Sequence, residues 1–450
     1  MMPTLVERRT FLQGAAVTGG AAVAQPSILA EQVGAASANS SNILLTVTLA
    51  GGNDGINTVG PFADGRYQDL RASLALSAST AHTARDGQYF HPSLRRLATR
   101  FRRGEVAVVQ GVGDPLKDHS HFSNMARWQT GLPNGAIHRT GWLGRWLDAN
   151  STAAFTALAV GGQGVPLHLR GESSTVTDLP RGGGGLYGAD TSDRRDRVMY
   201  TRLSRMARGS TGRPWVDAVA DVNDQAIDAA QAVSPAYNVE LPEDRFHSDM
   251  LLSARLLNLN LGTRVMNVWQ SGYDTHDNQV DGNPAQGDHA DLLDELDRGL
   301  DTFFTTLSPA IAPRVTVVVY SEFGRRGEAN GSRGTDHGAG GTMFVIGSGV
   351  AGGMYGSPLN VRDLDDRGDF KVSMDFRRVY SGLMEHWLGG DPDQVLGGSY
   401  NSLNVFAGSR PTGPTGPPPA NDDLKGRAEA IRARQSARRS DNLRYHSPSF

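Results

Sequence analysis

Short apolar runs alternate along the chain with segments whose apolar residues recur at helical spacing. The most marked run, Val315–Tyr320, is apolar throughout its length, which is typical of a strand buried on both faces, as in a parallel sheet. The predicted strands are Ile43–Leu49, Val106–Val109, Phe155–Val160, Val265–Trp269, Val315–Tyr320 and Met343–Ile346. The predicted helices are His91–Arg103, Trp142–Leu147, Asp249–Leu261, Asp288–Leu307 and Met374–Leu388. This alternation predicts an α/β fold with a mainly parallel sheet sandwiched between helices.

The N-terminal segment departs from this pattern. An arginine pair opens the motif Arg8–Leu12, a weakly apolar stretch follows at Gly14–Ala24, and Ala36–Ala38 offers small residues at the spacing of a cleavage site. In this order the features resemble a twin-arginine export signal at residues 1–38. The alternative is a disordered, Ala-rich start. The first interpretation predicts a protein exported to the periplasm or the extracellular space.

The remaining chain divides by composition. Residues 39–408 carry the strand and helix pattern and form the predicted α/β domain. Within it, residues 161–248 are weakly patterned and are interpreted as an insertion or lid. Residues 409–450, a Pro/Gly segment followed by an Arg-rich tail, cannot bury enough apolar surface to fold alone.

Composition excludes several classes of site and partner. The chain has no cysteine, which rules out disulfides, thiolate metal sites and cysteine nucleophiles. A formal net charge of −3 gives no basis for nucleic-acid binding. Outside the N-terminus there is no uncharged apolar run of about 18 residues, so no spanning helix is expected in the mature chain.

Acidic residues and histidines follow the ends of several predicted strands. Because parallel strands have their carboxyl ends at one edge of a sheet, these groups are expected to meet there. Carboxylates and imidazoles together suit Zn, Mn or Fe, and Ca or Mg where carboxylates dominate. The sequence therefore predicts a divalent metal site. Its candidate ligands are Asp54, Asp274, His276, Glu322, Asp336 and His337.

Each candidate also has a structural interpretation. Asp54 could be a turn former or helix cap, and Glu322 could simply pair with Arg325 or Arg326. Asp274 and His276 are two residues apart, so in an extended segment both side chains point the same way and could bind one cation. The joint pattern favours a site.

The predicted long polar loop Gly111–Gly131 adds further candidates. His119 and His121 are suited to general acid/base work, and Lys117 to holding an anionic group. Arg325 is a candidate anion clamp for an ester substrate. The alternative for all of them is a solvated surface loop.

Several longer motifs resemble the DUF1501 family of exported bacterial proteins, which is placed in the alkaline phosphatase/sulfatase-like superfamily. The motifs that carry this resemblance are Leu49–Val59, Ser120–Gly131, Tyr273–Gln279, Ser321–Arg326, Gly334–Gly341 and Asp375–Gly389. The resemblance implies an alkaline phosphatase-like parallel sheet with metals at the strand ends. It implies that Asp54, Asp274, His276 and His337 are ligands and that Asp336 is a further ligand or supports one.

Two positions depart from the superfamily pattern. Glu322 and Phe323 stand where an Asp-His pair is expected, so a ligand histidine is replaced by Phe323. Asn57 and Thr58 lie nearest to the position of the superfamily nucleophile. Asn57 is no nucleophile and is a candidate substrate-binding residue. Thr58 is a candidate nucleophile. The absence of cysteine and of a Ser-x-Pro-x-Arg motif rules out a formylglycine sulfatase.

Two functions follow from these observations. The first is an exported metal-dependent hydrolase of phosphate or sulfate esters. The second is a catalytically inactive, metal-binding, secreted binding or assembly protein of the same fold. Members of the resembled family are often encoded beside the DUF1800 family, which implies a DUF1800-family protein as a partner.

Overall fold

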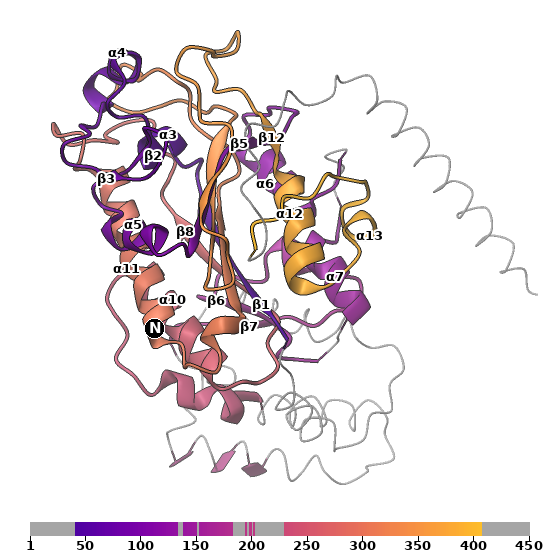
Figure 1. The fold of residues 1–450 in the computed structure, drawn as a ribbon. Coiled ribbons are helices and arrows are strands. Elements are labelled where there is room, and N and C mark those ends of the chain that lie inside the picture. Colours follow the sequence, from indigo (N-terminus) through magenta and orange to yellow (C-terminus); the bar gives the residue numbers. More distant parts are fainter. Residues whose placement is uncertain are drawn as a thin grey trace, which may run out of the picture.

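The computed structural model describes residues 41–133, 138–150, 153–182, 194–195, 198–199, 201–202 and 229–406. The predicted export signal, the predicted tail at 409–450 and the middle of the predicted insertion lie outside these residues. A large sheet forms the centre of the described chain, with helices on both faces (Figure 1). This arrangement confirms the predicted α/β fold.

The large sheet has the strand order β11-β5-β10-β9-β1-β8-β6-β7, with β12 paired to β5. Its strands are β1 (Ile43–Ala50), β5 (Val106–Gly113), β6 (Ala157–Val160), β7 (Thr177–Leu179), β8 (Val265–Ser271), β9 (Val315–Tyr320), β10 (Gly341–Ile346), β11 (Gly353–Gly356) and β12 (Met374–Asp375). Within the described chain, β10 alone runs antiparallel to its neighbours, and the other pairs of this sheet are parallel. Every strand predicted from the sequence is present.

A small sheet and a set of helices complete the described fold. The small sheet joins β2 (Val59–Gly60), β4 (Tyr89–Phe90) and β3 (His82–Thr83). The α-helices are α3 (Gly55–Thr58), α4 (Gly65–Arg71), α5 (Arg95–Arg102), α6 (His121–Thr130), α7 (Trp142–Asn150), α10 (Arg245–Asn258), α11 (Asp288–Thr306), α12 (Phe376–Leu383) and α13 (Pro392–Leu396). Short helical turns are η1 (Ala72–Leu74), η2 (Leu167–Leu169), η4 (Ser234–Tyr237), η5 (Ala312–Arg314) and η6 (Met384–Leu388). Among the described helices, none has the length and apolar character needed to cross a membrane.

The two faces of the sheet bury separate apolar cores. Helices α5, α10 and α11 cover one face, and α6, α7, α12 and α13 cover the other (Figure 1). Successive residues of β1 point to opposite faces, so Leu45 packs in the first core and Leu44 in the second. Because both faces are covered, the strand carries no charged residue and its threonines, Thr46 and Thr48, are buried as well, which is why its sequence predicts it well.

Helix α6 differs from the prediction, because Gly111–Gly131 was expected to be a loop throughout. The buried face of α6 includes Arg127 beside Trp128. Arg127 pairs with Asp114 at 2.6 Å and with Asp118 at 2.7 Å. A helix is predicted from apolar residues that recur on its buried face. In α6 that face includes an ion-paired arginine, so the apolar pattern is interrupted and the helix was missed.

The topology brings several loops to one edge of the sheet. The parallel strands β1, β5, β8 and β9 all end at that edge. Strand β10 is antiparallel to β9 and β5, so it begins there. The loops that follow Ala50, Gly113, Ser271 and Tyr320, and the loop that precedes Gly341, are therefore neighbours.

A buried histidine of η2, which contacts β1, makes the stability of the fold depend on pH. His168 is fully buried, its Nε2 lies 3.0 Å from Thr46 Oγ1, and burial lowers its pKa from 6.5 to about 3. As the pH falls below 6.5, the unfolded chain takes up a proton that the folded chain does not, so stability is complete above 6.5 and is lost in acid. Between pH 7 and pH 4.5 the free energy of unfolding of the wild type should fall by about 2–3 kcal/mol more than that of His168→Gln.

The measurement is denaturant unfolding from pH 4 to 7, with His386→Gln at a partly exposed histidine as the control. The control should follow the wild type. Equal acid losses in the wild type and His168→Gln would contradict the prediction.

Candidate metal centre

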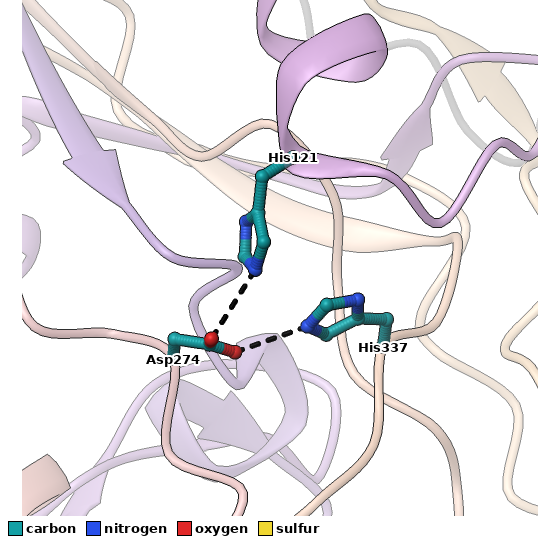
Figure 2. Close-up of side chains that lie close together, drawn as sticks. All are labelled: His121, Asp274 and His337. Carbon is teal, nitrogen blue, oxygen red and sulfur yellow. Dashed lines mark hydrogen bonds and ion pairs between the residues drawn. The ribbon is translucent and has the colours of Figure 1, made fainter.

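Three side chains from separate loops converge at this edge of the sheet (Figure 2). His121 is the first residue of α6, Asp274 follows β8, and His337 precedes β10. The Nε2 atom of His121 lies 3.3 Å from Oδ2 of Asp274, and the Nε2 atom of His337 lies 3.0 Å from Oδ1. Zinc ligands at about 2.0–2.2 Å from one ion stand about 3–3.5 Å apart. The spacing therefore fits ligands of a single cation.

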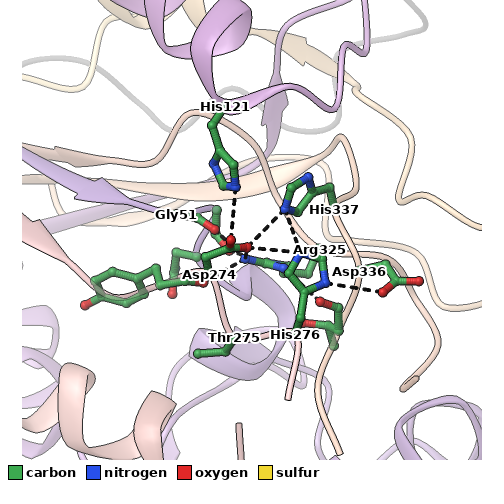
Figure 3. A network of polar contacts seen from close by, with 12 residues as sticks. Gly51, His121, Asp274, Thr275, His276, Arg325, Asp336 and His337 are labelled. Carbon is green, nitrogen blue, oxygen red and sulfur yellow. Dashed lines mark hydrogen bonds and ion pairs between the residues drawn. The ribbon is translucent and has the colours of Figure 1, made fainter. Parts of the chain in front are cut away.

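His276 adds another imidazole to the cluster (Figure 3). Its Nε2 lies 3.1 Å from Oδ1 of Asp274 and 2.8 Å from Nε2 of His337. Asp274, His276 and His337 were predicted as ligands from the sequence. His121 was predicted as an acid/base group, and the structure places its ring nitrogen with the candidate ligands.

Each histidine of the cluster turns its outer ring nitrogen toward an oxygen atom. The Nδ1 contacts are His121 to Glu322 Oε1 at 2.8 Å, His337 to the carbonyl oxygen of His119 at 2.7 Å, and His276 to Asp336 Oδ1 at 3.4 Å. Metal-binding histidines in proteins almost always donate their second ring N–H to a carboxylate, carbonyl or water, which fixes the ring and its tautomer. The cluster has this feature at all of its imidazoles.

The hydrogen bond at Nδ1 of His337 leaves its Nε2 atom available to a cation. A carbonyl oxygen can only accept, so Nδ1 of His337 carries the proton that faces His119. Burial lowers the pKa of His337, and a neutral ring then has a bare lone pair at Nε2. This lone pair faces a carboxylate oxygen of Asp274 at 3.0 Å. This lone pair can accept a hydrogen bond from Nε2 of His276, 2.8 Å away, or bind a cation that lies between it and the carboxylate.

At His121 a bound cation would compete with a proton. The buried Nε2 atom of His121 makes no hydrogen bond of good geometry, and its polar neighbour is Oδ2 of Asp274 at 3.3 Å. The hydrogen bond to Glu322 on the other side of the ring raises the pKa of His121. The imidazole and carboxylate donors of the cluster are of the kind that zinc, manganese and iron accept, and a cation bound at Nε2 of His121 would displace the proton that the raised pKa favours.

Arg325 connects the loops of the site through hydrogen bonds to their backbone. Its side chain is buried and donates to the carbonyl oxygens of Gly51, Gly52, Tyr273 and Thr335. It also donates to the cluster carboxylate at 2.8 Å.

Asp274 responds to these contacts. Partial burial opposes its ionisation, but hydrogen bonds from Arg325 and His337 outweigh this effect and lower its pKa to about 2. The carboxylate is therefore charged at neutral pH. Close backbone contact also fixes its position, because a Cβ at Gly51, where φ is +124°, would lie 2.3 Å from the amide nitrogen of Asp274.

Other predicted site residues lie in a separate buried polar group. Asp54 accepts from Arg71 at 2.6 Å and from Gln279 at 2.7 Å. The hydroxyl of Thr58 is fully buried and donates to the carbonyl of Asp54. Asn57 bonds the hydroxyl of Tyr67 and the carbonyl of Leu74 through its amide. The predicted roles of Asp54, Asn57 and Thr58 stay predictions.

Lys117 and His119 tie the segment before α6 to a neighbouring loop. Lys117 pairs with Asp365 at 2.9 Å, and Nε2 of His119 lies 2.7 Å from Oδ2 of the fully buried Asp369. The imidazole of His119 is thus directed away from the cluster, while its carbonyl orients His337. The predicted roles of Lys117 as a substrate-binding residue and of His119 as an acid/base residue stay predictions.

Phe323 and Glu322 occupy distinct places around the histidines. The ring of Phe323 lies 4.9 Å from the ring of His121 and 4.6 Å from that of His337, measured between centroids. It forms an apolar wall beside both. Glu322, predicted as a ligand, is 2% exposed and bonds His121 and the amide of Gly51. Its carboxylate lies behind the imidazole, so in this structure it orients a candidate ligand.

The fold and the cluster define an α/β protein with a candidate metal centre at the carboxyl edge of its sheet. A family model described as "Protein of unknown function (DUF1501)" matches residues 107–362. The match spans more than half of the 450 residues, and the chain belongs to this family. The curated proteins contain no match.

Solved structures resemble the chain at low similarity. The lipoteichoic acid synthase LtaP from Listeria monocytogenes has 11% identity and a TM-score of 0.35, over 76% of this chain and 73% of its own. A protein in the alkaline phosphatase superfamily from Vibrio parahaemolyticus has 10% identity and a TM-score of 0.35, over 100% of this chain and 98% of its own. The zinc complex of the C-terminal periplasmic domain of EcEptC from Escherichia coli has 9% identity and a TM-score of 0.33, over 80% of this chain and 87% of its own. The description of the fold therefore rests on the strand order given above.

Substituting Glu322 tests whether it supports the centre. Glu322→Gln keeps the size of the side chain but removes the charge that faces Nδ1 of His121. We expect Zn²⁺ affinity to fall by about 10- to 100-fold, the usual effect of losing such a supporting carboxylate. Competition titration against a zinc chelator measures it. Glu328→Gln, at an exposed position in the same loop, should bind like the wild type, and an unchanged affinity in Glu322→Gln would exclude the supporting role.

Proposed function

We propose that this protein is an exported, metal-dependent hydrolase of phosphate or sulfate esters, with its cation held by His121, Asp274, His276 and His337. The observation that carries the proposal is the shared orientation of the histidines. Their Nε2 atoms converge on one carboxylate while their Nδ1 atoms face oxygen acceptors. The ester class comes from the motifs that resemble the alkaline phosphatase/sulfatase-like superfamily.

The residues of the chain have distinct parts in this proposal. Glu322 and the carbonyl of His119 hold His121 and His337 in the tautomer that leaves Nε2 free to bind a metal. Arg325 keeps Asp274 ionised and in place. A divalent cation bound there would polarise the ester and make an attacking water more acidic. Water is the proposed nucleophile, because the Thr58 hydroxyl is buried and already donates to the Asp54 carbonyl.

The test combines metal content with turnover. Protein purified after export is analysed for bound metals and assayed with aryl phosphates and aryl sulfates, before and after removal of metal by a chelator. The proposal predicts about one divalent cation per chain and ester hydrolysis that is lost on chelation and restored by the metal. Absence of stoichiometric metal would overturn it.

The inactive alternative has one observation in its favour. Two cationic side chains that were candidates for anion binding already have partners, since Lys117 pairs with Asp365 and Arg325 donates to carbonyl oxygens and Asp274. A protein with these groups committed could keep the cation as a structural element and act as a binding or assembly factor, with a DUF1800-family protein as the proposed partner. Bound metal without turnover on any ester would favour this alternative over the hydrolase.

A further inference from the structure

One face of α6 lines a cavity that reaches the candidate metal centre. The cavity has a volume of about 520 Å³. Phe122, Met125, Ala126 and Gln129 all line it, and their spacing places them on the same side of a helix. Leu167 of η2 also lines this cavity. Its wall is therefore largely apolar along α6.

The exposure of Phe122 makes this wall unusual for the molecule. Phe122 is 92% exposed, although it directly follows the candidate ligand His121. In the described part of the chain, the other exposed large apolar side chains are Leu116, Val198 and Met199, and none of them lines the cavity. A single exposed apolar residue needs no explanation. Phe122, however, continues an apolar surface that Met125, Ala126 and Leu167 extend.

The same cavity has a polar end. Asp274, Glu322 and His121 line it together with Ala50 and Gly51 at the end of β1. A ligand that occupies the cavity would thus meet the candidate metal centre with one part and the side chains of α6 with another. The cavity is wide open to solvent, so a ligand bound there would stay partly exposed.

We propose that the ester substrate carries an apolar substituent, which packs against Phe122, Met125, Ala126 and Leu167 while its phosphate or sulfate group lies at the metal centre. This inference deepens the proposed function and rests on it for the polar end of the ligand. The occupant is a small amphiphilic ester rather than a protein surface, because the apolar wall and the candidate ligands belong to one cavity.

The test uses alkylphosphonic acids, whose C–P bond resists hydrolysis, with chains of two, four, six and eight carbons. Their affinity for the full-length protein is measured by calorimetry, with and without bound Zn²⁺. Because burial of each methylene is worth roughly a fourfold gain in affinity, wild-type affinity should rise steeply with chain length. Phe122→Ala should flatten this dependence, whereas Leu116→Ala, a change of another exposed apolar residue that does not line the cavity, should preserve it.

The outcomes separate this inference from the proposed function. A chain-length dependence that persists without zinc and is lost in Phe122→Ala supports the apolar subsite even if the metal proposal fails. Stoichiometric zinc binding with affinities that do not change with chain length overturns the subsite and leaves the metal proposal standing. A dependence of equal slope in the wild type and Phe122→Ala, or no binding of any phosphonate, also overturns the subsite.

Discussion

Replacing Asp274 with asparagine is expected to abolish stoichiometric binding of a divalent cation. The carboxylate lies within 3.3 Å of the Nε2 atoms of His121, His276 and His337, and it is the charged group at the centre of the cluster. Loss of a supporting residue beside a metal ligand costs about 10- to 100-fold in affinity, so loss of this carboxylate should exceed about 100-fold. Elemental analysis and zinc titration measure the change.

Asparagine is preferred to alanine because it keeps an oxygen for Arg325, whose buried guanidinium contacts Oδ1 of Asp274. The matched control is Asp277→Asn, which removes an exposed carboxylate from the same loop. The control should bind zinc like the wild type. If Asp274→Asn retains wild-type zinc affinity, the cluster is an ion-pair network and not a metal centre.

Replacing Arg325 with methionine is expected to give a large loss of stability, because each buried carbonyl oxygen left without a donor costs about 1–3 kcal/mol. The arginine is 1% exposed and bonds backbone carbonyls from the loops after β1 and β8, together with Thr335 ahead of β10. Methionine fills similar space but leaves those carbonyl oxygens without donors. Denaturant unfolding at pH 7 measures the loss.

Arg326→Met is the control for this prediction. The neighbouring Arg326 is 38% exposed, and its ion pairs with Asp336 and Asp369 are 3.6 and 3.7 Å long. The pair with the half-exposed Asp336 contributes about 0–1 kcal/mol, and the buried Asp369 keeps His119 as a partner at 2.7 Å, so the control should lose much less than Arg325→Met. Equal losses at both positions would mean that Arg325 does not hold the loops together.

The sheet was predictable because its strands are covered on both sides. Val315–Tyr320 and Ile43–Leu49 contain so little polar surface that only a buried position suits them, and the helices between them carry clear apolar stripes. The boundaries were less certain. Helix α10 begins at Arg245 and not at Asp249, because Asp244 accepts a hydrogen bond from the His247 amide and caps the helix there. Such a cap depends on one side chain rather than on a repeated pattern.

The candidate site was predictable only in part. Asp274, His276 and His337 were identified because they follow or precede buried strands whose ends meet. The place of His121 in the candidate centre depends on α6. The polar sequence conceals this helix, because Arg127 is buried by pairing with Asp114 and Asp118. The His-x-His spacing of His119 and His121 was the available signal. Which of the two rings faces the cluster is decided by Asp369, which lies about 250 residues further along the chain.

The long separations within this centre set an order of events for the newly made protein. His121 and Glu322 are 201 residues apart, and Asp274 and His337 are 63 apart. While the chain is being synthesised, His121 and Asp274 are made before β9, the strand that lies beside β1 and β10 and carries Glu322 and Arg325 at its end. Pairings over such distances form late in folding. The candidate metal centre is therefore incomplete until the sheet is assembled, and uptake of a cation there would follow folding instead of guiding it.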